Sequence, residues 1–342
     1  MNKRLVYLIS VPVAIIALVT YFTFRLFYSP SVFPKSEVSI LFIPSGSDIR
    51  QAFDTISSKL DIRNPEALKW FAEKKKYNEA VKAGRYLIRK PLSANELINI
   101  LRSGNKTPVR ITFNNIRTLN QLAGKFGRQL ETDSVKFLDY FADESNFSPD
   151  GFNKATIIAL FLPDTYEFFW NTDAEGVYRR MLKEYNRFWD GERIRKAEEK
   201  GLSKIEVSIL ASIIDDEVNR KDEKPKIAGV YLNRLKRGIP LQACPTIKFA
   251  LNDFTITRVL KIHLITESPY NTYKYKGFPP GPIGCPSIEG IDAVLNAEKH
   301  DYLYFAAKAD FSGYHNFSRT LAEHNRYAAE YQRELNRRKI FK

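Results

Sequence analysis

The first pattern along the chain is an uninterrupted apolar run. Residues 5–24, "LVYLISVPVAIIALVTYFTF", contain 20 residues without a charge, about the length that a helix needs to cross a bilayer. A cleaved secretory signal is the competing interpretation, but such signals have an apolar core of roughly 7 to 15 residues and a small-x-small exit site. Here "RLFYSPSVF" follows instead. We therefore predict an uncleaved transmembrane anchor.

Turn-forming residues without periodicity follow the span and predict a linker over residues 25–36. A small α/β module is expected over residues 37–113. Alternating or short apolar runs predict its strands at 38–43, 84–88 and 109–113, and helical periodicity predicts its helices at 48–60, 65–77 and 93–104. Ser93 and Glu96 have capping-box spacing, and Gly104 marks the end of the last helix.

The remaining residues, 114–342, are predicted to form one mixed α/β domain. Residues 118–200 are mainly helical in pattern, with an extended segment at 160–170, and residues 203–237 predict two helices that end before Gly238. A Pro- and Gly-rich loop covers 272–287, and the C-terminal part predicts a strand, a turn near Gly313, a second strand and a closing charged helix. The predicted fold class is therefore α+β, with a single N-terminal transmembrane helix.

Charge changes this picture in two ways. Lys3 and Arg4 precede the span and only Arg25 follows it closely, so residues 1–4 are predicted to be a cytoplasmic tip and the rest to face outward. Of the 53 basic residues 51 follow the span, as do all 39 acidic ones, which leaves the outward part at +12. Such charge first suggests nucleic acid. On an exported chain, anionic lipid heads, an anionic wall polymer or simple solubility are the alternatives.

The residues that usually hold metals are sparse. Four histidines lie far apart and the two cysteines, Cys244 and Cys285, have no zinc-site spacing, so no metal and no cofactor is predicted. In an oxidising compartment two cysteines can instead pair.

Three consecutive acidic residues end the apolar helix "SILASIIDDE". At about 100° per residue, Val207, Leu210, Ala211, Ile214 and Val218 share one stripe. Glu217 falls at the edge of that stripe, whereas Asp215 and Asp216 point elsewhere and are predicted to be solvated or paired with Lys and Arg. A carboxylate beside apolar side chains has a raised pKa and suits general acid and base catalysis. An ion pair at a helix flank remains the alternative for Glu217.

The next helix presents a cation within its apolar stripe. Arg234 projects among Ile227, Val230, Tyr231 and Leu235, and a buried guanidinium needs an anion or several carbonyls. A structural role is favoured, such as a salt bridge to an acid of the preceding helix, with orientation of a site as the alternative.

Polar and aromatic residues gather on the following loops. Aromatic faces with amides and hydroxyls suit a sugar polymer, whose rings stack and present many hydroxyls. The candidates are Gln242, Thr246, Tyr270, Asn271, Thr272, Tyr273, Pro280 and Gly281.

Six ordered blocks resemble the endolytic murein (peptidoglycan) transglycosylase family, also called YceG-like: "ASIIDDE", "IAGVYLNRL", "LQACPT", "SPYNTY", "GFPPGPI" and "HNFSRTLAEHN". The segment "AGRYLIRKPLSANELINILRSG" is similar to that family's small LysM-like module. The resemblance implies that Glu217 is the catalytic glutamate, and it adds Asn233 and His315 to the substrate-binding candidates.

The resemblance also implies a function and a location. We expect a lytic transglycosylase of the bacterial inner membrane, with its catalytic domain in the periplasm. It would cleave the MurNAc–GlcNAc bond within nascent glycan strands, leave a 1,6-anhydroMurNAc end and set strand length. Peptidoglycan, the membrane and cell-wall synthases are the expected partners, and nucleic acid is not. A non-catalytic, membrane-anchored glycan-binding scaffold is the alternative.

Four positions depart from the family pattern. Ile158 and Ala159 stand where a glutamate and a glycine are usual, and Cys244 replaces a common aspartate. Cys285 also stands where other residues are usual. Because both cysteine-containing blocks should line one cleft, a Cys244–Cys285 disulfide that braces the cleft is our hypothesis, and two unpaired, buried thiols are the alternative.

Overall fold

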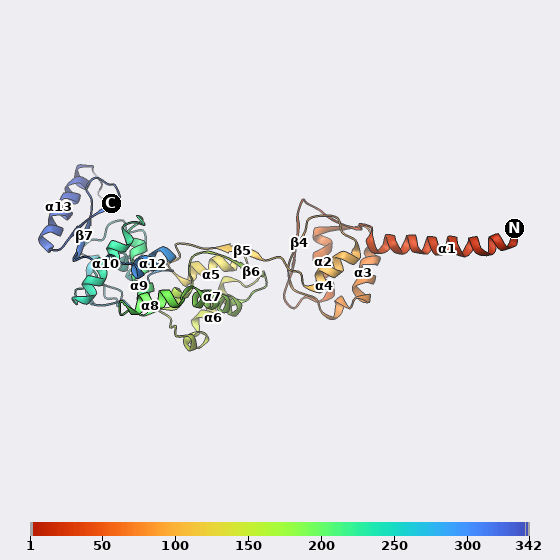
Figure 1. Ribbon diagram of the computed structural model, residues 1–342, viewed down its shortest axis with the longest axis horizontal. Coiled ribbons are helices and arrows are strands. Elements are labelled where there is room, and N and C mark those ends of the chain that lie inside the picture. The colour runs from red at the N-terminus through yellow and green to blue at the C-terminus, as the bar shows by residue number, and fades with distance from the viewer. Residues whose placement is uncertain (1–2, 339, 341–342) are drawn as a thin grey trace. The chain divides into compact units, whose positions relative to one another are not determined.

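The N-terminal apolar run forms helix α1 (Lys3–Tyr28) in the computed structural model, which describes residues 3–338 and 340 (Figure 1). Its stretch Ile9–Tyr28 has a mean hydropathy of 1.8, is not buried, and is long and apolar enough to cross a membrane. The helix thus continues past the predicted end of the span at residue 24. Of the predicted cytoplasmic tip, residues 1 and 2 lie outside the described residues.

The chain divides into two units. The first extends to Ile111 and includes two later segments, Gln129–Thr132 and Glu167–Asp173, while the second contains Thr112–Arg128, Asp133–Tyr166 and Ala174–Lys342. The sequence places the domain boundary after residue 113 and assigns no later segment to the first unit. The return of these two segments is a long-range contact that local patterns do not reveal.

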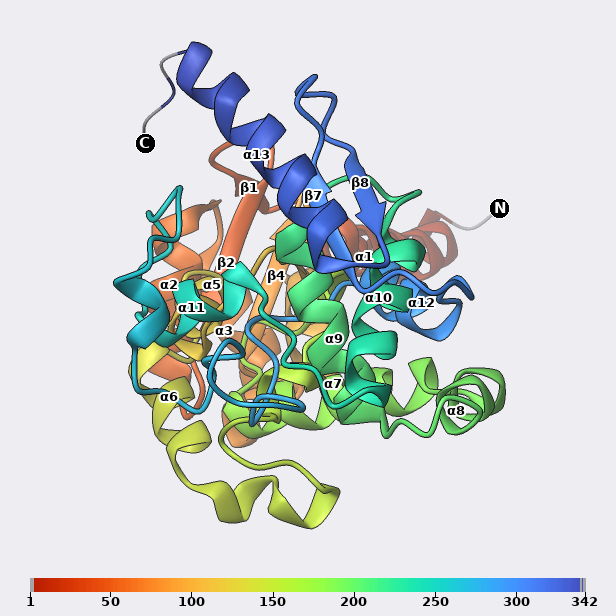
Figure 2. The same ribbon diagram turned by 90° about the vertical axis from the view of Figure 1, so that its left-hand side faces the viewer.

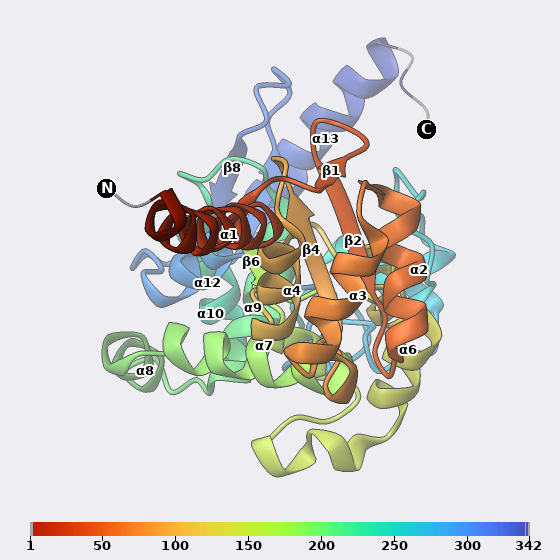
Figure 3. The same cartoon turned by 90° about the vertical axis from the view of Figure 1, so that its right-hand side faces the viewer.

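The first unit combines short strands with three helices. After α1, its elements are β1 (Val32–Pro34), β2 (Ser39–Ile43), α2 (Ile49–Lys59), β3 (Leu60–Ile62), α3 (Pro65–Lys74), η1 (Tyr77–Glu79), β4 (Gly84–Ile88) and α4 (Ala94–Ser103). β2 pairs with β4 antiparallel, with Leu41 opposite Tyr86, and β1 pairs with β3. Figure 3 shows α2, α3 and α4 beside β2 and β4. The predicted strands and helices of this region are confirmed.

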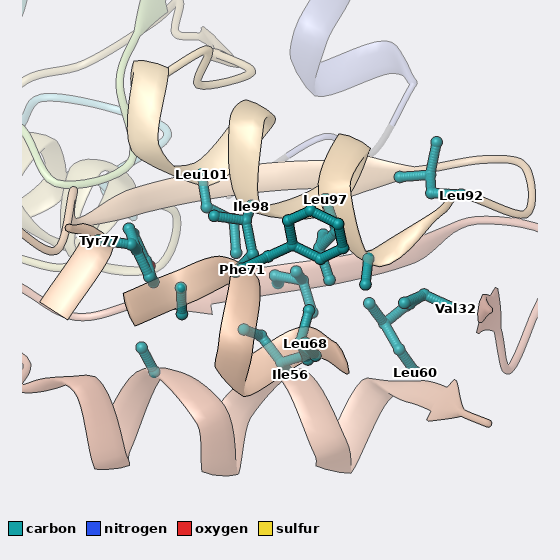
Figure 4. Packing of buried hydrophobic residues seen from close by; sticks show 14 of the residues in the cluster. Val32, Ile56, Leu60, Leu68, Phe71, Tyr77, Leu92, Leu97, Ile98 and Leu101 are labelled. Atoms are coloured by element: carbon teal, nitrogen blue, oxygen red, sulfur yellow. The ribbon is translucent and has the colours of Figure 1, made fainter. Parts of the chain in front are cut away.

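The core of the first unit forms where the helices meet the β2–β4 sheet. Alternate residues of both strands are buried, as expected for a sheet with one covered face. Figure 4 shows Leu68, Phe71 and Leu97 pointing toward one another from α3 and α4. The capping box of Ser93 and Glu96 and the left-handed Gly104 (φ 72°) bound α4 as predicted.

The predicted linker is partly wrong. Within residues 25–36, α1 continues to Tyr28, and Val32–Pro34 form β1, which pairs with β3. The Val32 side chain is fully buried in the core of the first unit. This strand is too short to show a periodic pattern, and its pairing partners lie 26 to 30 residues away, so the sequence signal is only that of a turn-rich segment.

The second unit is mostly helical. Its helices are α5 (Leu119–Gly127), α6 (Ser134–Ala142), η2 (Glu144–Asn146), η3 (Ser148–Asp150), η4 (Ile157–Leu160), α7 (Ala174–Phe188), α8 (Gly191–Glu198), α9 (Lys204–Glu217), α10 (Lys224–Lys236), α11 (Cys244–Ala250), η5 (His263–Ile265), α12 (Ile288–Leu295) and α13 (Leu321–Arg337). Its hairpin consists of β7 (Tyr304–Ala307) paired with β8 (His315–Ser318), while β5 (Val109–Thr112) and β6 (Thr165–Phe168), which pair with each other, have residues in both units. This mixture confirms the α+β class.

Helix α9 lies at the centre of the second unit. Ser203 caps its N-terminus with Glu206, as predicted, and Pro225 lies in the first turn of α10. Residues 207–214 of α9 are all buried, including Ser208 and Ser212, so the helix is covered on every side and not on one stripe. It packs against α10, α11 and α12, and Figure 2 shows α9 and α10 side by side.

The C-terminal part follows the predicted strand–turn–strand–helix order. β7 and β8 are antiparallel, with Ala307 opposite His315, and Gly313 adopts a left-handed φ of 79° in the connecting turn. Helix α13 packs against both strands (Figure 2). The hairpin thereby brings His315, the first residue of β8, to the C-terminal end of α9.

Candidate active site

Glu217 is the last residue of α9 and faces a cavity of about 380 Å³. The chain becomes extended at Val218, so the helix stops where the carboxylate reaches the cavity. Residues from the end of α9 and from the β7–β8 hairpin form the wall: Glu217, Val218, Asn219, Arg220, Ala307, Lys308, Phe311, Ser312, Gly313, Tyr314 and His315, with Tyr331 from α13.

Burial governs the chemistry of Glu217. It raises the pKa of the carboxyl from an ordinary 4.5 to about 7, although hydrogen bonds from the Tyr231 hydroxyl and the Cys244 backbone N–H, and the nearby Lys248 charge, lower it. Tyr231 Oη donates to Glu217 Oε1 at 3.2 Å. A carboxyl in this state holds a proton near neutral pH and can donate it, which is the property of a general acid.

The raised pKa has a consequence for stability. Glu217 binds its proton more tightly in the folded than in the unfolded protein, so its contribution is favourable below about pH 4.5 and is lost as pH rises through about 7. We expect Glu217→Gln to increase the free energy of unfolding at pH 8 by about 1 to 2 kcal/mol, and by less at pH 5, because the amide carries no charge to desolvate. Urea denaturation at both pH values measures this. An equal change at both would contradict it.

The two neighbouring acids have separate, structural partners. Asp215 Oδ1 accepts from Lys224 Nζ at 2.6 Å, and Asp215 also accepts from the backbone N–H and hydroxyl of Ser287, the N-cap of α12. Asp216 forms a two-point pair with Arg117, at 3.2 and 2.9 Å. The predicted pairing with Lys and Arg is confirmed, and Asp215 joins α9 to α10 and α12.

Arg234 is buried, as its place in the apolar stripe predicts, but its partners are not acids. Its Nε donates to Pro240 O at 2.8 Å, its Nη1 to Leu303 O at 2.9 Å, and its Nη2 to Gln242 Oε1. The expected salt bridge to the preceding helix is therefore wrong. Carbonyl oxygens accept the hydrogen bonds of this guanidinium. Of the acids at the end of α9, Asp215 and Asp216 are already paired and Glu217 faces its cavity.

The hypothesis of a Cys244–Cys285 disulfide is also wrong, because both thiols are free. Cys244 Sγ lies 3.2 Å from Tyr273 Oη, next to Glu217. Cys285 is buried, its backbone N–H donates to Ile116 O at 2.7 Å, and it lines a different cavity. The two sulfur atoms therefore have different surroundings, and burial raises the pKa of each thiol.

Three predicted substrate-binding residues are internal. Thr246, Asn271 and Thr272 are at most 2% exposed. The Thr246 and Thr272 hydroxyls hydrogen-bond each other at 2.8 Å, and Asn271 Nδ2 donates to two carbonyls of the preceding loop. These side chains fix the loop that follows α11, and their polar atoms are unavailable to a ligand. Their prediction as binding residues is wrong.

Residues around them remain on the surface. Gln242 is exposed and adopts a left-handed φ of 54°, Tyr270 packs its ring against Phe249 at 4.6 Å, and Pro280 is exposed. Tyr273 contacts the Cys244 thiol, and burial raises its pKa. These four stay candidates for binding, although none lines the cavity of Glu217.

Gly281 has a packing role. A Cβ atom at this position would lie 2.0 Å from the Ala155 carbonyl oxygen, so only glycine allows the two chain segments to approach this closely. Gly281 is also buried. Its packing therefore explains why glycine occupies this position, without any contact to a substrate.

Of the two candidates added by the family resemblance, Asn233 lies away from the cavity of Glu217 and His315 lines it. Asn233 lies two residues after Tyr231, on the other side of α10, and its Nδ2 donates to the backbone oxygens of His300 and Tyr302 at 2.6 and 3.0 Å. It lines a separate hollow with His300, so the expectation that it lies beside Glu217 is wrong. His315, in contrast, lines the same cavity as Glu217.

A second cavity of about 460 Å³ adjoins the first. Val218 and Asn219 line both, and Asn114, Asn115, Arg117 and Asp216 line the second alone. Glu217 therefore ends its helix beside two neighbouring hollows, which is a suitable arrangement for a chain-like ligand. Among the described residues, no group of three His, Cys, Asp or Glu side chains is arranged to hold a metal ion.

Two residues of this site are missing from the sequence prediction. Tyr231 is assigned there to the apolar stripe of α10, and Glu223 has no role. A buried tyrosine hydroxyl usually needs a partner, so Tyr231 carried a weak signal. For Glu223 the sequence offers none, because its partner His315 is 92 residues away.

The chain is similar to several known proteins. The profile of the YceG-like family matches residues 41–330. The endolytic murein transglycosylase of Bacillus subtilis (strain 168) is 31% identical over 305 residues, which cover 84% of this chain and 83% of that protein. The protein of the same name from Streptococcus pneumoniae (strain D39 / NCTC 7466) is 26% identical over 325 residues, and this chain spans 57% of its length.

A solved structure is also similar. The crystal structure of a putative yceG-like protein from Listeria monocytogenes matches with a TM-score of 0.54 and 26% identity, covering 85% of this chain and 98% of that one. Since the family profile extends over most of both units, the chain belongs to the YceG-like family.

Proposed function

We propose that the protein is a membrane-anchored endolytic lytic transglycosylase that cleaves the MurNAc–GlcNAc bond within peptidoglycan glycan strands. The observation that carries this proposal is Glu217, whose pKa of about 7 and position in a cavity suit proton donation to a glycosidic oxygen. The names of the relatives support the substrate class and the type of reaction. The product is a 1,6-anhydroMurNAc end, and the cleavage sets glycan strand length.

One carboxyl group is sufficient for this reaction. Glu217 protonates the glycosidic oxygen, and the 6-hydroxyl of the same MurNAc residue attacks C1 in place of water. Ordinary glycoside hydrolysis usually needs a flanking carboxylate pair, one to protonate and one to activate water or attack. Asp215 and Asp216 are held in separate ion pairs. This is compatible with Glu217 being the one catalytic carboxylate at this helix end.

The rest of the chain supports this role. α1 anchors the protein in the inner membrane with residues 1–4 on the cytoplasmic side, and both units face the periplasm. The first unit, with its LysM-like segment, binds glycan, and the net charge of +12 after the span attracts the anionic wall. Cell-wall synthases are the partners that this placement favours.

Digestion of uncrosslinked glycan strands by the full-length protein tests the proposal. We expect 1,6-anhydroMurNAc ends in internal fragments, detected by mass spectrometry. Reducing ends in their place would identify a hydrolase. Binding of strands without any cleavage would identify a glycan-binding scaffold.

The pH dependence tests the acid role of Glu217. Because the protonated carboxyl reacts, we expect kcat/KM to fall as pH rises through about 7. Tyr231→Phe removes a hydrogen bond that stabilises the carboxylate, so the descending limb should move up by about one pH unit. Tyr275→Phe, at an exposed tyrosine whose hydroxyl contacts Glu267, is the matched control and should leave the profile unchanged. A downward shift in Tyr231→Phe would contradict this assignment.

A further inference from the structure

A histidine in the wall of the Glu217 cavity is paired with a second carboxylate. His315 donates its backbone N–H to Glu223 Oε1 at 3.0 Å, and its Nδ1 lies 2.9 Å from Glu223 Oε2. The side chains are only 13% and 9% exposed. The proposed function does not use this pair, although His315 lies in the cavity wall.

The contacts determine which imidazole nitrogen is available. An ionised carboxylate can only accept hydrogen bonds, so the proton of a neutral His315 ring lies on Nδ1 and Nε2 carries a lone pair. Among the described residues, no protein group hydrogen-bonds to Nε2, and this atom is not among their buried atoms that lack a partner. Nε2 is therefore open to a ligand.

Aromatic packing holds the imidazole at the wall. The Phe305 ring meets the His315 ring edge to face, with centroids 5.4 Å apart, and meets the Tyr231 ring in the same way at 5.8 Å. Tyr231 is the hydroxyl partner of Glu217. One connected set of side chains thus fixes both Glu217 and His315, which limits the freedom of the two groups relative to each other.

We propose that His315, oriented by Glu223, is a second catalytic residue that accepts the proton of the MurNAc 6-hydroxyl. This inference rests on the proposed function. As Glu217 gives its proton to the leaving glycosidic oxygen, the bond from C1 to that oxygen breaks and the bond from C1 to O6 forms. The O6 proton moves to Nε2. The imidazolium then returns a proton through water to the Glu217 carboxylate, and the site is restored.

A separate acid and a separate base carry out the two proton transfers more readily than a single group does. A carboxyl group must lose its proton before it can accept another, so Glu217 alone would have to act as acid and base in turn. An imidazole can accept a proton near neutral pH while the carboxyl donates. Glu223 is a positioning residue, since its carboxylate hydrogen-bonds His315, fixes the tautomer and stabilises the imidazolium that forms.

Three variants of the full-length protein test the proposal. In His315→Gln the acceptor is lost, and we expect kcat to fall by about 10² to 10⁴ with little change in KM. In Glu223→Gln the amide oxygen must accept the backbone N–H of His315, so the amide NH₂ faces Nδ1. The ring proton is then forced onto Nε2, which can no longer accept, and we expect a loss of similar order. If the His315–Glu223 pair were only structural, the Glu223→Gln variant would keep both hydrogen bonds and the activity of wild type.

Chemical rescue distinguishes proton transfer from packing. Added imidazole should raise the rate of His315→Gly and leave that of wild type unchanged, measured as 1,6-anhydro ends released from uncrosslinked strands. His263→Gln, in the exposed loop of η5 and outside the cavity, is the matched control and should keep wild-type kcat.

The outcomes separate this inference from the proposed function. If wild type releases no anhydro ends, the proposed function fails. If wild type does so while His315→Gln or Glu223→Gln loses less than about tenfold in kcat, below the range of proton transfer, His315 is not the acceptor. Absence of rescue in His315→Gly overturns the proton-transfer role as well, and it decides the question even if His315→Gln has a lower Tm.

Discussion

Glu217→Gln is expected to remove nearly all release of 1,6-anhydroMurNAc ends from uncrosslinked glycan strands. The amide matches the carboxyl in size but cannot give up a proton near neutral pH, and positioned general acids contribute about 10² to 10⁴ in rate. Because the carboxyl is held by Tyr231 and by a backbone N–H, glutamine can keep the local packing. kcat and KM from single-strand digestion measure the effect, which should fall on kcat.

Asp216→Asn is the matched control for this prediction. It is the adjacent acid on the same helix and undergoes the same chemical change, but its contact is an exposed two-point pair with Arg117. Exposed pairs contribute about 0 to 1 kcal/mol, so kcat should stay close to wild type. If Glu217→Gln makes as many anhydro ends as wild type, the assignment of the general acid is wrong. If Asp216→Asn lowers kcat as much as Glu217→Gln does, Glu217 is not the only catalytic acid at this helix end.

Arg234→Met is expected to lower the free energy of unfolding by about 3 kcal/mol. Arg234 is 4% exposed, and its guanidinium supplies hydrogen bonds to Pro240 O, Leu303 O and the Gln242 side chain. Methionine fills similar volume but leaves these acceptors without a donor. The Leu303 carbonyl contact is buried and the other two are partly buried, and a buried acceptor left unpaired costs roughly 1 to 3 kcal/mol. The lower cost of burying a neutral side chain offsets part of this loss.

The urea denaturation midpoint and Tm measure that effect. Arg179→Met is the matched control, because the Arg179 side chain is 74% exposed and pairs with Glu175 one turn earlier on α7. Its replacement should change the free energy of unfolding by less than about 0.5 kcal/mol. Equal effects at the two arginines would show that burial and carbonyl contacts at Arg234 contribute nothing.

Local patterns were sufficient for most elements. The strand Gly84–Ile88, the capped helix Ala94–Ser103 and the order of β7, β8 and α13 agree with the sequence prediction, because alternation, capping residues and glycines act over a few residues. The β1–β3 pair and the return of Gln129–Thr132 to the first unit escaped prediction. Both depend on contacts between distant segments, and short strands carry little periodic signal of their own.

The amphipathic description of α9 illustrates a different limit. The stripe of Val207, Leu210, Ala211 and Ile214 is buried as expected, but Ser208 and Ser212 on the other faces are buried too. Ser212 Oγ accepts the backbone N–H of Ile283 at 3.0 Å, so a loop covers the face that looks polar in the sequence. A serine is small enough to be buried once its hydrogen bonds are made, and only the packed structure shows whether they are.

The same reason explains the errors among the binding residues. Thr246, Asn271, Thr272 and Asn233 have the chemistry that a sugar polymer requires, yet their hydrogen bonds go to their own chain. Polar side chains on loops serve either purpose, and sequence distinguishes the two only through partners that it does not reveal.

The sequence by itself determined the apolar N-terminal helix, the α+β class and the position of Glu217 at the end of an apolar helix, since each follows from interactions within one segment. Only the tertiary structure decided which cations pair with Asp215 and Asp216 and that the cysteines are free. It also decided that the Tyr231 hydroxyl contacts Glu217 and that His315 lines the same cavity as Glu217. These relations connect residues that are far apart along the chain. They depend on how helices and loops pack, and packing also produces the burial that raises the pKa of Glu217.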